Sequence, residues 1–236
     1  MVEIIAEIGI NHNGSMAMAK ELIRQAAIAG ADVAKFQAYS VDALFGPDGE
    51  DPNPEIWKGV KPLEFNKEQF AELKHYCDVE NIEFMASVFD EERLGWMEEL
   101  GVKRHKIASR TSKLARGLAE KIVATDKECF MSLGFDAKPF DRHYYNLKYL
   151  YCVAKYPTDY KDLQLPEVFT NTIYSGFSDH SLGIEASLVA IARGAAVIEK
   201  HFTLNKGLPG FDHICSCDPA ELKDLVHYAR RMERVV

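Results

Sequence analysis

Eight short apolar runs recur along this chain of 236 residues, and their spacing constrains the fold more than any other feature. They occupy residues 3–10, 32–38, 82–89, 104–109, 128–133, 148–154, 173–178 and 196–202. Most of them are too rich in apolar residues to keep one face in water, which is typical of strands in a parallel sheet that helices cover. We therefore expect eight strands.

Helical patterns lie between several of these runs. Residues 15–29, 67–80 and 183–195 carry apolar residues at helical spacing, and Asp90 and Asp218 are placed to cap two more helices. The connections after the fifth and sixth runs look short and irregular. The repeated alternation predicts a (β/α)₈ barrel of the TIM type, formed by a single domain over residues 1–236. An open doubly wound sheet is the alternative, but "GINHNG" after the first run lacks the expected G-x-G-x-x-G pattern.

One connection is much longer than the others. Residues 42–62, "DALFGPDGEDPNPEIWKGVKP", hold too many Pro, Gly and Asp residues for one long helix. Because a long loop after a barrel strand belongs to the active face, this segment is either a lid over the site or ordinary surface decoration.

Composition narrows the class of partner and the compartment. The formal net charge of −8 and the pI of about 5.5 argue against nucleic acid. No apolar run approaches the ~20 residues that span a membrane, and the first residues lack the basic start of a signal peptide. Five scattered cysteines fit reduced thiols, so we expect a cytoplasmic protein. Cys215 and Cys217 form a C-x-C pair, which is a weak metal signal.

Polar residues interrupt the apolar runs near their carboxyl ends, where a barrel of this kind places its chemistry. Each has an ordinary structural explanation, such as an ion pair between Glu7 and Lys35 or a helix cap at Asp179. Their joint occurrence favours one shared pocket. The residues concerned are Glu7, Lys35, Gln37, Ser87, Lys106, Ser109, Tyr156, Ser178, Asp179, His180, Glu199 and His201.

Two histidines occupy equivalent positions on the last two runs. His180 and His201 would lie on neighbouring strands, close enough to share one divalent cation with open coordination positions. Lys35 and Lys106, with nearby hydroxyls, would hold a phosphate and a carboxylate. Lys200 alternates to the other side of its strand, so we expect a structural or surface role. Together these residues predict a metal-assisted reaction on a small phosphorylated acid.

Several longer segments resemble the N-acetylneuraminate (sialic acid) synthases. They are "AEIGINHNG", "ADVAKFQ", "KIAS", "YPTDYKDLQL", "GFSDHSLGIEASLVAIARGAAVIEKHFTL" and "LPGFDH", in that order along nearly the whole chain. The resemblance implies a (β/α)₈ barrel that condenses phosphoenolpyruvate with an N-acylated amino sugar aldehyde and releases phosphate. It also implies a divalent cation, most often Mn²⁺, with Mg²⁺ and Co²⁺ as alternatives.

The resemblance carries roles to individual residues. His180 and His201 fall on the metal ligands. The positions that match phosphoenolpyruvate contacts are Lys35, Ser87, Lys106, Ser109 and Ser178. The positions around the sugar and the reacting carbons are Glu7, Gln37, Tyr156, Glu199 and Asp212. Of these, we expect Glu7, Lys35 and Lys106 to be catalytic.

The chain departs from the family pattern in three places. Thr111 stands where a glutamate is expected to act on the attacking water, and threonine is no base at neutral pH. Ala154 replaces an asparagine contact to the phosphate, for which Arg110 is a candidate substitute. The chain also stops where typical synthases continue into a small antifreeze-like domain that contacts the sugar.

These departures keep other hypotheses open. The chain is a synthase, or a catalytically reduced homologue that binds phosphoenolpyruvate or a sugar as a sensor or partner subunit, or a related enzyme with another acceptor. Because family members commonly pair, a homo-oligomer is expected.

Overall fold

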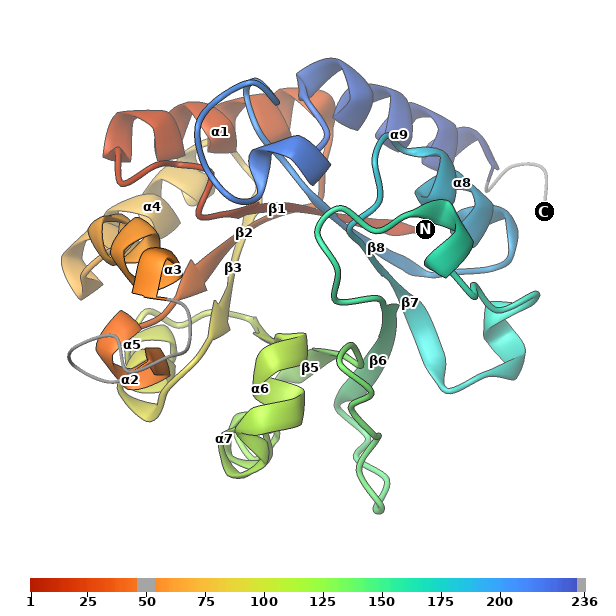
Figure 1. The fold of residues 1–236 in the computed structure, drawn as a ribbon, viewed down its shortest axis with the longest axis horizontal. Coiled ribbons are helices and arrows are strands. Elements are labelled where there is room, and N and C mark those ends of the chain that lie inside the picture. The colour runs from red at the N-terminus through yellow and green to blue at the C-terminus, as the bar shows by residue number, and fades with distance from the viewer. Residues whose placement is uncertain (46–53, 233–236) are drawn as a thin grey trace.

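Eight parallel strands close into a barrel in the order β1 to β8, with β8 paired to β1 (Figure 1). The structure is a computed structural model that describes residues 1–45 and 54–232. The strands are β1 Glu3–Gly9, β2 Val33–Ala38, β3 Glu83–Val88, β4 Arg104–Ile107, β5 Glu128–Ser132, β6 Leu147–Cys152, β7 Tyr174–Asp179 and β8 Val197–His201. All eight predicted strands are present and the barrel prediction is confirmed.

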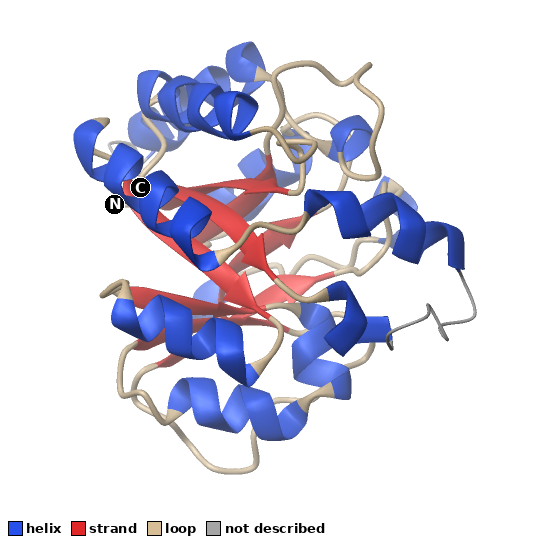
Figure 2. Ribbon diagram, turned by 90° about the vertical axis from the view of Figure 1, so that its left-hand side faces the viewer, coloured by secondary structure: helices blue, strands red, loops and turns tan. Residues whose placement is uncertain are grey.

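Helices surround the strands on the outside of the barrel (Figure 2). The α-helices are α1 Met16–Ala29, α2 Val41–Phe45, α3 Pro54–Val60, α4 Lys67–Val79, α5 Glu91–Glu99, α6 Ser109–Leu114, α7 Arg116–Val123, α8 Glu185–Ala192 and α9 Pro219–Met232. Short 3₁₀ helices are η1 Lys61–Leu63, η2 Tyr160–Asp162, η3 Phe169–Asn171 and η4 His213–Cys215. Within the described residues, β5 and β6 are followed by no α-helix, as their irregular connections predicted.

The predicted helix boundaries follow from local chemistry. Asp90 accepts a hydrogen bond from the Arg93 backbone N–H at 2.8 Å and so caps α5. Asp218 and Glu221 bond each other's backbone N–H groups at 3.0 Å, which is a capping box at the start of α9. Gly30 ends α1 at φ +87°, a conformation that costs glycine little.

In its described residues, the long connection between β2 and α4 contains short helices only. They are α2, α3 and the 3₁₀ turn η1, and their shortness fits the Pro and Gly content, which argued against one long helix. Residues 46–53 of this segment, expected to be either a lid or surface decoration, lie outside the described part of the chain. The described portion packs Leu44, Trp57 and Leu63 against a small apolar cluster near Tyr39.

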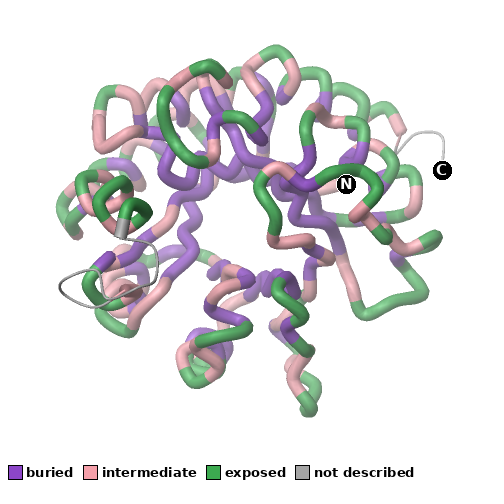
Figure 3. The backbone as a smooth tube through the Cα atoms, viewed as in Figure 1, coloured by how far each residue is buried: buried purple, intermediate pink, exposed green. Residues whose placement is uncertain are grey.

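Side chains that point into the barrel form three tiers, because every second residue of a strand faces the same way. Figure 3 shows the strands as the buried centre of the molecule. The middle tier is apolar and consists of Ile5, Val33, Met85, Phe130, Leu150 and Val197. The tier at the carboxyl ends is polar and forms the site described below. The tier at the amino ends is a charged ring of Glu3, Glu83, Arg104, Glu128 and Lys148.

Arg104 makes three of the ion pairs in this charged ring at the amino ends, called the lower ring below. Its guanidinium pairs with Glu3 from β1, with Glu83 from β3 at 2.9 Å and with Glu128 from β5 at 3.1 Å. One cation therefore ties three strands that are not all neighbours, at the end of the barrel opposite the polar tier.

No helix in the described residues combines the length and the apolar character needed to cross a membrane.

Replacing Arg104 by methionine should destabilise the barrel. The substitution keeps the aliphatic stem but leaves three largely buried carboxylates facing each other, and breaking a buried ion pair on one side costs about 3–5 kcal/mol. We expect a loss near the lower end, roughly 3 kcal/mol, because the Arg104 side chain keeps 16% exposure. Urea unfolding followed by circular dichroism measures it.

The matched control is Lys103→Met. Lys103 is the neighbouring residue, its side chain is 77% exposed, and its nearest carboxylate oxygen, on Glu83, is 3.9 Å away. We expect a change below about 0.5 kcal/mol for this exposed pair. Equal losses in the two variants would contradict the role given to Arg104.

Candidate active site

A cavity opens at the carboxyl ends of the strands, and most of the residues predicted from the sequence line it. Seven strands, all except β6, supply lining residues or the residues directly after them, and Tyr156 comes from the loop after β6. They are Glu7, Lys35, Gln37, Ser87, Phe89, Lys106, Ala108, Ser109, Ser132, Tyr156, Ser178, His180, Glu199 and His201. The barrel topology thus brings together residues that are spread over nearly 200 positions of the chain.

Four buried charges form the floor of this cavity. Lys35 Nζ lies 2.6 Å from Glu7 Oε2 and 3.5 Å from Glu199 Oε2. Lys106 Nζ lies 3.6 Å from Glu199 Oε1. All four side chains are at most 7% exposed. Glu199 therefore bridges the two ammonium groups, and each charge has a partner of opposite sign.

The surroundings shift the protonation of these groups in different directions. Burial raises the pKa of Glu7, although Lys35 opposes the effect. Burial also disfavours the ionised carboxyl of Glu199, but Lys106, Lys35 and a bond from Ser178 outweigh it and lower its pKa to about 2. Burial lowers the pKa of Lys106, whereas the two glutamates overcome burial and raise that of Lys35. Glu199 is thus the firmly ionised carboxylate of the pair.

Hydroxyl groups surround the two ammonium groups. Lys35 Nζ donates to Ser87 Oγ at 3.0 Å, and Lys106 Nζ donates to Ser132 Oγ at 2.8 Å. Ser178 Oγ donates to Glu199 Oε1 at 2.7 Å. Cations ringed by hydroxyls suit an oxyanion, because each group can donate a hydrogen bond to the same ligand.

His180 and His201 lie side by side at the rim, with ring centroids 5.4 Å apart. His180 Nδ1 is 2.8 Å from the Val153 carbonyl, which can only accept, so this nitrogen carries a proton and Nε2 is the ring nitrogen left for a ligand. Burial lowers the pKa of His180, but nearby Cys152 and the Val153 carbonyl reverse the balance and raise it.

His201 is held neutral. Burial lowers its pKa well below the ordinary value, and its Nδ1 is a buried atom with no hydrogen-bond partner. A neutral imidazole with an unpartnered buried nitrogen is chemically suited to a divalent cation. No third His, Cys, Asp or Glu in the described part of the chain completes a metal cluster, so a cation held by these two rings would keep open positions.

Tyr156 and Asp212 flank the histidine pair. The Tyr156 ring lies 4.1 Å from the His180 ring, and Asp212 Oδ2 lies 3.9 Å from His201 Nδ1. Burial raises the pKa of Asp212 to about 6. Tyr156 is 46% exposed, so it stands at the mouth of the cavity.

Two predicted site residues do not line the cavity: Asp212, which lies beside His201, and Arg110, which is directed elsewhere. Its guanidinium donates to the Leu44 carbonyl at 3.2 Å and lies 4.8 Å from the Phe45 ring centroid, at the end of α2. Thr111 is buried in α6, and neither Thr111 nor Ala154 lines the cavity. The position that lacks the expected glutamate thus places no replacement carboxylate against the floor.

Two outward-facing residues differ from expectation. Lys200 is fully buried, so a surface role is wrong, and it pairs with Asp179 at 3.3 Å. Asp179 does not cap the following helix, because α8 begins after Ile184; it accepts instead from the side chain of Ser187 within α8.

Ser132 is a lining residue that sequence reasoning missed. It ends β5, and its parity with Glu128 and Phe130 places it on the inner face. The alternation along the fifth apolar run therefore contained the signal.

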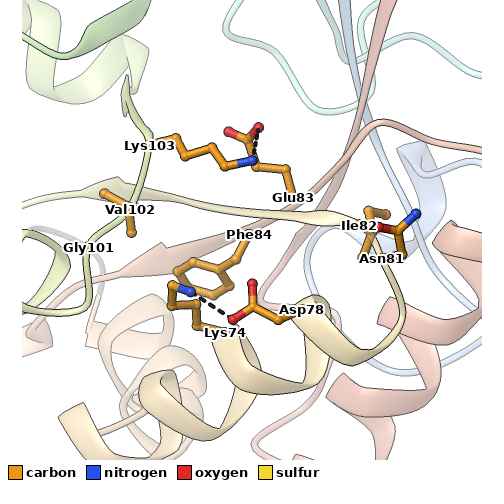
Figure 4. Close-up of a pocket in the computed structure, with 9 residues that line it drawn as sticks. All are labelled: Lys74, Asp78, Asn81, Ile82, Glu83, Phe84, Gly101, Val102 and Lys103. Carbon is orange, nitrogen blue, oxygen red and sulfur yellow. Dashed lines mark hydrogen bonds and ion pairs between the residues drawn. The ribbon is translucent and has the colours of Figure 1, made fainter.

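A larger cavity lies at the opposite end of the barrel, at the amino ends of β3 and β4 (Figure 4). Its volume is about 230 Å³ against about 50 Å³ for the cavity above, so size alone does not locate the site. Its charged residues are already paired with each other, Lys74 with Asp78 at 2.8 Å and Lys103 with Glu83 at 3.9 Å. It gathers no convergent buried cations or imidazoles, so we place the site at the carboxyl ends.

Comparison with known proteins identifies the relatives of this chain. The family model described as the NeuB family matches residues 22–236. An uncharacterized protein of Methanocaldococcus jannaschii is 36% identical over 246 residues, which cover 99% of this chain and 71% of that protein. The N,N'-diacetyllegionaminic acid synthase of Legionella pneumophila is 36% identical over 258 residues, covering 99% of this chain and 72% of the relative.

The fold has a close counterpart among solved structures. The N-acetylneuraminic acid (sialic acid) synthetase from Leptospira borgpetersenii, in complex with citrate, superposes with a TM-score of 0.90 at 36% identity. The match covers 99% of this chain and 84% of that one.

A buried histidine beside the site makes stability depend on pH. His12 follows β1, is 2% exposed, stacks on Phe65 at 4.0 Å and accepts at Nδ1 from the Gly14 N–H. Burial lowers its pKa to about 3. The unfolded chain therefore binds a proton that the folded chain does not, and stability is lost as pH falls below about 6.5.

Replacing His12 by phenylalanine should flatten this dependence while keeping the stack on Phe65. Between pH 6 and 4, we expect the slope of unfolding free energy against pH to fall by up to about 1.4 kcal/mol per pH unit. Urea unfolding at several pH values measures the slope. His75→Phe, on the exposed face of α4, is the control and should keep the wild-type slope. An unchanged slope for His12→Phe would show that His12 is protonated in the folded state.

Proposed function

This chain belongs to the NeuB family, and we propose that it joins phosphoenolpyruvate to an N-acylated amino sugar aldehyde, giving a sialic-acid-like nonulosonic acid and phosphate. Relatives named as legionaminic and sialic acid synthases support this reaction class. The observation that carries the proposal is the pair of buried ammonium groups, Lys35 and Lys106, which face one cavity beside two imidazoles.

Phosphoenolpyruvate presents a phosphate and a carboxylate to these cations. Glu199 contacts both ammonium groups: its Oε2 lies 3.5 Å from Lys35 Nζ and its Oε1 lies 3.6 Å from Lys106 Nζ. Both distances are longer than those of a close ion pair. An anionic ligand makes shorter charge-assisted bonds to the same ammonium groups. The hydroxyls of Ser87 and Ser132 already lie within hydrogen-bond distance of these ammonium groups. Ser109 and Ser178 line the same cavity and complete the proposed set of contacts.

His180 and His201 would hold a divalent cation, for which we propose Mn²⁺, with Mg²⁺ and Co²⁺ as alternatives. When bound there, such a cation polarises the carbonyl oxygen of the aldehyde. The chain's own contribution is to keep the His201 ring neutral by burial and to orient the His180 ring through the Val153 carbonyl.

The reaction needs one carbon–carbon bond, one water and one departing phosphate. The methylene carbon of phosphoenolpyruvate bonds to the aldehyde carbon, whose oxygen takes up a proton and becomes a hydroxyl. Water adds to the carbon that bears the phosphate oxygen, that carbon–oxygen bond breaks to release phosphate, and the added hydroxyl loses its proton to become the keto group. A base must take the proton of the water. Among the described residues, Glu7 and Glu199 are the carboxylates that line the cavity.

We propose that Glu7 accepts this proton. The position where the family's pattern would supply a glutamate holds Thr111, which cannot serve as a base. Gln37 Nε2 donates to Glu7 Oε1 at 3.1 Å and so fixes the orientation of the carboxylate. Lys35 neutralises the other oxygen, and an anion that draws Lys35 away leaves Glu7 free to accept. The residues proposed for the acceptor sugar are Gln37, Tyr156, Glu199 and Asp212; Tyr156 stands at the mouth of the cavity, whereas Glu199 belongs to its floor. A contact from Arg110 would require it to leave Leu44.

Phosphate release tests the proposal directly. The protein is incubated with Mn²⁺, phosphoenolpyruvate and a panel of N-acylated amino sugars, and inorganic phosphate is measured. We expect release with at least one sugar, and a fall of about 10²–10⁴-fold in kcat for Glu7→Gln because the proton acceptor is removed. If a folded protein releases no phosphate with any sugar of the panel, the proposed synthase activity is refuted.

Phosphoenolpyruvate affinity separates the synthase from a catalytically reduced binder. Calorimetry on Lys106→Met should show binding weakened at least about tenfold, the cost of one charge-assisted bond. Lys103→Met, at the far end of the barrel, should bind as the wild type does. Tight binding without phosphate release would favour the binder, whereas release would exclude it.

The two-histidine site predicts a specific loss of metal affinity. His201→Ala should weaken Mn²⁺ binding by about an order of magnitude or more, because one of two protein ligands is lost. Metal titration by calorimetry measures the dissociation constant. The control is His227→Ala, an exposed histidine of α9, which should leave the constant unchanged. Equal affinity in His201→Ala and wild type would exclude this assignment.

A further inference from the structure

Asp179 and Lys200 form a fully buried ion pair that no step of the proposed reaction uses. They are register partners on β7 and β8, with Nζ 3.3 Å from Oδ2 and no exposure of either side chain. One residue earlier on the same strands, Ser178 and Glu199 are partners too, and their 2.7 Å bond lies inside the barrel. Because side chains alternate, the Asp179–Lys200 pair lies outside it, against α8.

The bonds of this pair enclose His180. Asp179 Oδ1 accepts from the backbone N–H and the hydroxyl of Ser181 at 2.8 and 2.7 Å, and Oδ2 accepts from Ser187 Oγ at 2.6 Å. Lys200 donates to the Ser181 carbonyl. The residues on both sides of His180 are therefore bonded to each other, to α8 and to the neighbouring strand.

The backbones of both proposed metal ligands are also held. The His180 carbonyl accepts from the Thr158 N–H at 2.9 Å, and the His201 carbonyl accepts from the Cys217 N–H at 2.7 Å. Lys200 directly precedes His201, just as Asp179 directly precedes His180. Strands β7 and β8 are thus cross-linked on both faces immediately before the two imidazoles.

Stability alone does not account for such a pair. Desolvating two charges costs several kcal/mol, and apolar residues of similar volume commonly serve as well or better at such positions. What an ion pair adds is directional: it specifies one register and one spacing. A two-ligand cation site depends on such spacing, because residues that orient a ligand alter metal affinity about 10–100-fold.

We propose that the Asp179–Lys200 pair is a positioning device that sets the spacing and orientation of His180 and His201 for a divalent cation. The inference rests on the two-histidine site of the proposed function. It concerns a binding constant, so it is measured without turnover.

Lys200→Met tests the inference. We expect its Mn²⁺ dissociation constant to rise at least about tenfold. Its affinity for phosphoenolpyruvate, measured without metal, should stay within about twofold, because Lys35 and Lys106 are unaffected. Arg104→Met is the matched control: it breaks a buried charge network at the other end of the barrel, so it should lose stability and keep its Mn²⁺ affinity.

A double variant separates positioning from stability and serves if Lys200→Met does not fold. Asp179→Asn combined with Lys200→Met removes both charges, so no uncompensated charge stays buried and the urea midpoint should recover. The Mn²⁺ affinity should remain about tenfold or more below wild type, because the cross-link is still absent.

Wild-type Mn²⁺ affinity in Lys200→Met, or in the double variant, would overturn the inference and leave the histidine site intact. A different result marks failure of the site itself: if His201→Ala binds Mn²⁺ as the wild type does, both the site and this inference fall. Weak binding in both Lys200→Met and Arg104→Met would also overturn it, since loss of stability would then explain the effect.

Discussion

The buried charge network of Glu7, Lys35, Lys106 and Glu199 is the constraint on which the upper half of the barrel depends. Each ionised group would cost several kcal/mol if it were buried alone. The network avoids this cost by sharing: Lys35 serves both carboxylates, and Glu199 serves both ammonium groups. An anion that enters the cavity joins this balance, so ligand binding and the ionisation of the floor are one electrostatic problem.

The apolar tier directly below the network strengthens the electrostatic interactions between its four charges. Ile5, Met85 and Phe130, with their neighbours in the apolar tier, close the barrel beneath the charges and exclude water from that side. A medium of low polarity strengthens every interaction between the charges above it. The lower ring around Arg104 then seals the far end. Alternation along single strands produces all three tiers, as Glu3, Ile5 and Glu7 illustrate on β1.

Sequence patterns predicted the fold well because burial of both sheet faces leaves continuous apolar runs, which are local features. Polar residues at the carboxyl ends of those runs also pointed to the cavity that we take as the candidate site. Polarity alone does not say which face a residue takes, and this is why Ser132 was missed. Lys200 was expected to be structural or at the surface, because parity shows that it points outward but not that α8 and Asp179 bury it. Arg110 contacts Leu44 through a loop conformation that no periodicity encodes.

The proposed anion and cation sites would hold their ligands differently, and the difference follows from how each ligand bonds. Ammonium groups act as point charges on flexible stems, so Lys35 and Lys106 need only side-chain partners to serve an anion of variable position. Imidazole ligands must direct a lone pair, and small misplacement costs affinity. The structure accordingly anchors the backbones of His180 and His201 and cross-links their strands on both faces. Rigid ligands for the proposed cation beside adaptable ligands for the proposed anion suit the proposed condensation, in which one substrate must be held in a fixed orientation while the charge on the other changes as its phosphate leaves.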